Sequence, residues 1–230
     1  MLFGFFYYDW TILIVLPALI FTIWAQISVN SRFNKYSQVR TSRGLTGAEA
    51  ARRILDENGL HDVRIERVRG SMTDHYDPRD NVIRLSETVH DVASVAAVGV
   101  AAHEAGHAVQ YARHYGPIKL RASILPITRV GSMMAMPIFI IGLFLAMESL
   151  LLLGILLYSA VTLFQLLTLP VEFNASARAL DTLEYTHMMF GDELAGARKV
   201  LSAAAMTYVA ALATSLLTLL RLLALANRRR

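Results

Sequence analysis

Three long apolar stretches, one of them about twice the length of a single span, are separated by polar sequence along the chain. The first runs from Asp9 to Asn30 and carries Trp10 and Trp24 toward its ends. About 20 apolar residues in a helix cross the hydrocarbon core of a bilayer, and tryptophan is enriched where a span meets the headgroups. The stretch therefore predicts a transmembrane anchor. The residues before it contain no Lys or Arg, which favours a retained anchor over a cleaved signal peptide.

The other apolar stretches lie in the second half of the chain. One extends from Val130 to Leu169, about twice the length of a single span, and is interrupted by Met147 to Ser149. This pattern predicts a transmembrane helical hairpin. The last stretch, Ser202 to Asn227, contains Arg221, whose long side chain can reach the interface from near a helix end. It predicts a fourth span or an interfacial helix, so three to four transmembrane helices are expected.

Polar sequence separates the first span from the hairpin and predicts its own regular elements. Thr46 and Glu49 have capping-box spacing and Gly59 follows a helical pattern, which together predict one capped helix. Residues 63–68 and 81–86 alternate between apolar and polar side chains, with the turn-rich sequence TDHYDPRD between them. This arrangement predicts a short β hairpin.

A long helix is expected next, over residues 91–114, and Gly116 and Pro117 are expected to end it. The pattern as a whole predicts a mainly α membrane protein. It divides the chain into an N-terminal anchor (1–30), a polar module (31–127), a transmembrane hairpin (128–170), a further helix (171–201) and a C-terminal helix with a basic tail (202–230).

Composition supports this organisation and limits the chemistry. Hydrophobic residues make up 55% of the chain and charged residues 17%, and the mean hydropathy is +0.44, which is too apolar for an ordinary soluble domain. The net charge of +4 comes from scattered basic residues and no nucleic-acid-binding motif accompanies it. The chain has no cysteine, so any metal must be held by His, Asp or Glu.

The sequence HEAGH lies within the predicted helix over residues 91–114. His103 and His107 are four residues apart, so both imidazoles project from one helix face and can bind one ion. Glu104 follows the first histidine, where it can reach a water on the metal and act as general base. Ala105 and Gly106 keep the helix narrow at this point. The opposing interpretation, two incidental histidines, leaves buried polar groups without partners on an apolar helix.

A third ligand is expected from beyond the hairpin. Glu172 follows the second apolar half and Pro170, and an even number of crossings returns it to the membrane side of His103. It can therefore complete a site of two histidines and one carboxylate, which leaves zinc an open position for water. The competing interpretation places Glu172 at a helix N-terminus, where the helix dipole favours a carboxylate.

The chain resembles the YugP-type family of neutral zinc metallopeptidases. The resemblance rests on an N-terminal anchor and on DHYDPRDNVIRLS, AAVGVAAHEAGHAVQ, LRASILPITRVGS and LPVEFNASARAL. It implies a zincin-like, gluzincin module, one Zn²⁺ on His103, His107 and Glu172, and Glu104 as general base. EFNASARA is also similar to the E-x-x-A-D segment of HtpX-type membrane proteases, but Ser176 stands where that group has Asp. Orientation of a ligand could instead come from Ser176, Asn174 or Arg178.

Polar residues before the second predicted strand are weaker candidates. His75 or Tyr76 could stabilise an oxyanion, or this segment could hold a substrate as an added strand. A polar hairpin turn explains the same residues.

The expected function is a membrane-embedded, zinc-dependent endopeptidase acting on membrane-proximal proteins or peptides. A zinc-containing scaffold without turnover, and a hydrolase of non-peptide bonds, are the alternatives. Basic residues flank the polar module: Arg32, Lys35, Arg40, Arg43, Lys119, Arg121 and Arg129. They place this module in the cytoplasm, although Arg228 to Arg230 oppose that orientation if there are four full crossings. The family resemblance implies a prokaryotic cell membrane. Nothing in the sequence sets an oligomeric state.

Overall fold

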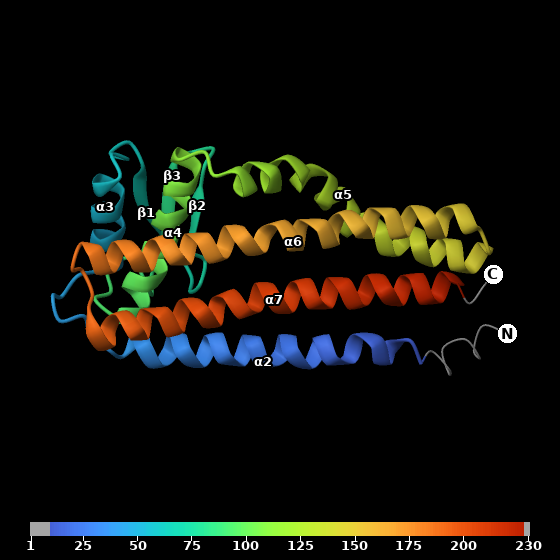
Figure 1. Cartoon of the computed structure of the whole chain (residues 1–230), viewed down its shortest axis with the longest axis horizontal. Helices are drawn as coiled ribbons and strands as arrows, with labels where there is room; N and C mark the ends of the chain where they lie inside the picture. The colour runs from blue at the N-terminus through green and yellow to red at the C-terminus, as the bar shows by residue number, and fades with distance from the viewer. Residues whose placement is uncertain (1–9, 228–230) are drawn as a thin grey trace. The chain divides into compact units, whose positions relative to one another are not determined.

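The computed structural model describes residues 10–227 and is mainly helical, as predicted (Figure 1). The start of the first predicted span at Asp9 and the basic residues Arg228 to Arg230 lie outside the described residues. The elements in chain order are α2 (Ile12–Ser37), α3 (Gly47–Glu57), β1 (Arg64–Val68), β2 (His75–Asp77), β3 (Val82–Ser86), α4 (Val95–Ala112), α5 (Gly116–Leu145), α6 (Glu148–Tyr185) and α7 (Gly191–Asn227).

Four of these helices, α2, α5, α6 and α7, are long and apolar enough to cross a membrane. Many of their apolar side chains are exposed, among them Met133 at 73% and Leu156 at 68%. Exposed apolar surface of this extent suits contact with lipid rather than water. The last predicted stretch, Ser202 to Asn227, is therefore part of a fourth helix with the length and composition of a span.

The described chain forms two compact units. The membrane unit contains residues 10–25, 120–169 and 207–227, and the polar unit contains residues 26–119 and 170–206. Long helices thus contribute one end to each unit.

In the membrane unit the chain turns back after Leu145, so that α6 runs alongside α5 (Figure 1). This arrangement confirms the predicted helical hairpin. Small residues let the two helices approach closely, since a Cβ on Gly131 would lie 2.6 Å from the carbonyl oxygen of Leu157. Hydroxyl groups join other helices in this unit: Ser215 donates to Thr162 on α6 at 2.7 Å.

The sheet of the polar unit has three strands in the order β1-β3-β2. Both predicted strands are present, but they pair in parallel, with Arg64 opposite Val82 and Val68 opposite Ser86. The predicted hairpin instead joins β3 to β2, which lies in the segment expected to be only a turn. Alternating apolar and polar residues favour a strand, but they do not specify its partner or direction.

Helix α4 is central to the core of the polar unit. Ser94 caps its N-terminus by accepting from the Ala97 amide, and the capping box predicted for α3 is present at Thr46 and Glu49. Alanines on more than one side of α4 are fully buried, including Ala96, Ala97, Ala101 and Ala102. Such small side chains allow α3, β2 and β3 all to pack against one helix.

Helix α6 differs from the expectation at Glu172. It runs without interruption through Pro170 to Tyr185, so Glu172 lies well inside the helix rather than at its N-terminus. Proline removes one backbone donor, and such a loss is tolerated inside long apolar helices. The helix-dipole interpretation of Glu172 is therefore wrong.

Candidate metal centre

Three side chains from two helices of the polar unit meet at one point. His103 and His107 come from α4, and Glu172 comes from α6. The Oε2 atom of Glu172 lies 3.3 Å from Nε2 of His103 and 3.5 Å from Nε2 of His107. The exposed fractions of the three side chains are only 14%, 13% and 4%. The pairing of the two histidines with this glutamate is the arrangement that the spacing predicted.

The second nitrogen of each imidazole contacts another polar side chain. Nδ1 of His103 lies 3.1 Å from Oγ of Ser176, and Nδ1 of His107 lies 2.9 Å from Oε1 of Gln110. Both rings are thereby oriented with Nε2 toward Glu172. Metal-binding histidines typically use one ring nitrogen for the metal and the other for such a hydrogen bond.

The donor set fits a zinc ion. Its three ligand atoms lie within 4.8 Å of one another, and two nitrogens with one carboxylate oxygen form a usual catalytic zinc set. Ligand atoms about 2.0–2.2 Å from a tetrahedral ion lie about 3.3–3.6 Å from each other. The separations of Glu172 from His103 and His107, 3.3 and 3.5 Å, agree with that spacing.

Charge around His107 favours its protonated form in the absence of metal. Burial alone would lower the pKa of the imidazole, but the hydrogen bond and negative charge of Glu172, together with Glu104, hold this pKa above its ordinary value. A proton and a metal ion compete for the same Nε2 lone pair. Acidic solution therefore opposes metal binding at this residue.

Glu104 lies beside the histidine pair on α4 and is 9% exposed. Its Oε2 accepts a hydrogen bond of 3.0 Å from the backbone N–H of Tyr76. Tyr76 belongs to β2, which is an edge strand of the sheet. The edge of the sheet thus restrains the carboxylate that the sequence indicated as a general base.

Tyr76 and His75 differ in their contacts with the candidate metal centre. Through its backbone Tyr76 reaches Glu104, while its hydroxyl donates to Oδ1 of Asn81 at 2.9 Å. The His75 side chain is exposed, and its Nδ1 lies 2.9 Å from the carbonyl oxygen of Thr73. Only Tyr76 of this pair therefore contacts a residue of the metal centre, through a backbone group rather than the predicted side chain.

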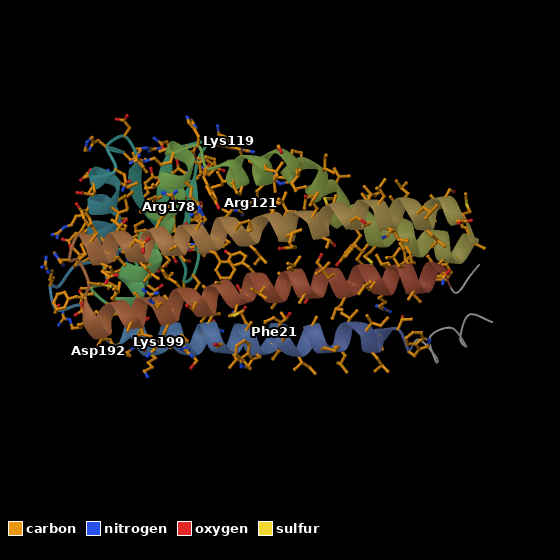
Figure 2. The ribbon with its side chains drawn as sticks, viewed as in Figure 1. Phe21, Lys119, Arg121, Arg178, Asp192 and Lys199 are labelled. Carbon is orange, nitrogen blue, oxygen red and sulfur yellow. The ribbon has the colours of Figure 1, made fainter. Side chains whose placement is uncertain are left out.

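Of the three further candidates on α6, Ser176 lies against Nδ1 of His103, whereas Asn174 and Arg178 are connected to His107 through Gln110. Asn174 accepts hydrogen bonds from Gln110 at 3.0 Å and from Arg178 at 2.8 Å. Figure 2 marks Arg178 on α6. Gln110 was not among the residues that the sequence predicted for the site, although its position three residues after His107 places it on the same helix face.

Close approach of α4 and α6 depends on a glycine between the histidines. A Cβ on Gly106 would lie 2.6 Å from the carbonyl oxygen of Ala175. Neighbouring Ala105 is fully buried. A side chain at position 106 would push α6 away and carry Glu172 with it, because both Ala175 and Glu172 are fixed in that helix.

Comparison with known proteins agrees with the donor set. Residues 11–227 match a family model described as "Putative neutral zinc metallopeptidase". The chain is 51% identical over 210 residues to the "Putative membrane protease YugP" of Bacillus subtilis (strain 168), covering 91% of this chain and 93% of that protein. No protein of solved structure matches the chain. With four helices able to cross a bilayer, the chain is an integral membrane protein that belongs to this zinc metallopeptidase family.

Proposed function

We propose that the protein is a zinc-dependent endopeptidase, with His103, His107 and Glu172 as the ligands of one zinc ion and Glu104 as its general base. The observation that carries this proposal is the convergence of the three ligand atoms on the turn of α4 that also presents Glu104. A site that only stabilised the fold would not require that glutamate.

Zinc held by these ligands would polarise a peptide carbonyl and lower the pKa of a water molecule to about 7. The carboxylate of Glu104 accepts a proton from the attacking water and returns it to the leaving amine. The Tyr76 N–H restrains rotation of this carboxylate through its 3.0 Å hydrogen bond. Such restraint keeps the base aligned with the reacting groups.

Helix α4 ends at Ala112, and α5, which has the composition of a span, begins at Gly116. Such a short connection favours substrates whose cleaved bond lies near the bilayer surface, whether in membrane proteins or in peptides at that surface.

Purified protein in detergent provides the test of activity. Wild-type protein is expected to bind one zinc ion per chain and to cleave casein at internal peptide bonds. Removal of zinc with a chelator should abolish cleavage, and added Zn²⁺ should restore it, because only the metal supplies the Lewis acid. Zinc-loaded protein that cleaves neither casein nor itself would favour a structural zinc protein without turnover.

The polar unit is proposed to lie in the cytoplasm, because basic residues flank it in the sequence. Similarity to a membrane protease of Bacillus subtilis supports a prokaryotic cell membrane as its location. The chain has no cysteine, so single cysteines can report the orientation. A Ser42→Cys variant should react with a membrane-impermeant maleimide only after cells are opened. Ser149→Cys at the hairpin turn, also at an exposed serine, should react in intact cells. The opposite labelling pattern would reverse the orientation.

A further inference from the structure

We propose that Gln110 is a positioning residue, which selects the tautomer of His107 and ties α4 to α6 beside Glu172. The inference rests on the proposed zinc site and deepens it. Gln110 has 0% exposure, and its amide group makes three hydrogen bonds: from His107 Nδ1 to its Oε1, and from its Nε2 to Val171 and Asn174.

The direction of these hydrogen bonds follows from partner groups that can act only as donors or only as acceptors. A backbone carbonyl can only accept, so the atom of Gln110 that lies 2.7 Å from the Val171 oxygen is the donor Nε2. Oε1 is then the atom that faces His107 at 2.9 Å. Because Oε1 can only accept, the neutral imidazole carries its proton on Nδ1 and keeps the Nε2 lone pair toward Glu172.

Arg178 supports the same assignment of the Gln110 amide, because its Nε–H group can only donate. The atom of Asn174 that this group contacts at 2.8 Å is therefore the acceptor Oδ1. The same oxygen accepts from Gln110 Nε2 at 3.0 Å. Both N–H groups of the Gln110 amide are therefore used, and the buried side chain cannot rotate by 180° without placing its oxygen against two acceptors.

The same contacts join the two helices that carry the ligands. Val171 directly precedes Glu172 on α6, and its carbonyl is bound by a side chain three residues beyond His107 on α4. One buried amide thus sets both the ring nitrogen that His107 offers and the position of the chain at Glu172. Outer partners of this kind typically change metal affinity about 10–100-fold when they are lost.

Two substitutions separate these effects. Gln110→Met has similar volume and makes none of the hydrogen bonds, so zinc affinity should fall about 10–100-fold, and metal-free His107 should populate both neutral tautomers. Gln110→Glu keeps an acceptor for Nδ1 but offers at most one O–H, where the amide donates two N–H groups to Val171 and Asn174. The tautomer should therefore persist while zinc affinity still falls. Thr41→Val is the control, because it removes another buried hydrogen bond of the polar unit, to Leu45.

Full-length protein in detergent is measured in two ways. Zinc affinity comes from competition with a chromophoric chelator. The tautomer comes from ¹⁵N NMR of histidine-labelled, metal-free protein at a pH where the rings are neutral, with the His107 signal identified by its loss in His107→Ala. Thr41→Val should lower thermal stability without altering either quantity.

Zinc affinity of Gln110→Met within twofold of wild type, or an unchanged tautomer, would overturn the proposal. If Gln110→Met does not fold, Gln110→Glu decides: wild-type zinc affinity or a changed tautomer would overturn it. Failure of the proposed function is distinguishable, because wild-type protein that binds zinc without cleaving peptides leaves both measurements in place. The tautomer is read without any metal.

Discussion

Replacing Glu104 by Gln is expected to abolish peptide hydrolysis while zinc remains bound. The amide has nearly the same shape and its oxygen can still accept from the Tyr76 N–H, which now binds Oε2 of the carboxylate at 3.0 Å. It cannot accept the proton of the attacking water. Loss of a general base typically lowers the rate about 100- to 10,000-fold. The measurement pairs kcat on a peptide substrate with zinc content per chain.

A matched control uses the same substitution elsewhere in the polar unit. Glu57 is exposed on α3, so Glu57→Gln should leave both zinc content and kcat unchanged. Glu104→Gln protein that keeps zinc and cleaves at the wild-type rate would remove Glu104 from the mechanism. Zinc loss in Glu104→Gln would instead show that this carboxylate supports the metal rather than the proton transfer.

Replacing Glu172 by Ala is expected to cost the protein its zinc. Glu172 is 3% exposed and brings a carboxylate oxygen within 3.3 Å of His103 and 3.5 Å of His107. Without it two imidazoles remain, whereas catalytic zinc sites use three protein ligands. Affinity should fall by more than the roughly 10–100-fold that loss of an outer partner costs. Competition with a chelator measures the loss.

Thermal unfolding gives an independent measure of the same loss. A ligand that binds only the folded state raises its stability, so added Zn²⁺ should raise the Tm of wild-type protein and leave that of Glu172→Ala unchanged. Glu184→Ala, an exposed glutamate on the same helix, should behave as wild type. Retention of zinc by Glu172→Ala would show that another carboxylate completes the site.

Much of the fold could be predicted from one-dimensional patterns. The helical hairpin depends on the length of an apolar stretch and on one short polar break, both of which can be counted in the sequence. The capped helix α3 is equally local, because Thr46 and Glu49 interact within a single turn. The pairing of His103 with His107 follows from helical spacing, and only an even number of crossings was needed to bring Glu172 to the same side.

The sheet and the surroundings of the metal centre were decided by tertiary structure. Parallel pairing of β1 with β3, and the formation of β2 in an expected turn, join segments that no local pattern pairs, and β2 and β3 both contact α4. The continuation of α6 through Pro170 likewise reverses a local signal. Glu104 accepts a hydrogen bond from the backbone N–H of Tyr76. A backbone contact of this kind does not depend on the residue type, so it cannot be predicted from the sequence motif.

The residue pattern therefore predicted the long apolar helices, the motif on α4 and the three candidate ligands that now lie together, because spacing along a helix and the length of a span are local quantities. Tertiary structure alone decided which groups orient those ligands. Gln110 is one residue among many on an apolar helix until α6 packs against α4 and places Val171 and Asn174 within hydrogen-bonding distance of its side chain. Hydrogen bonds between distant segments form only where packing brings donor and acceptor together.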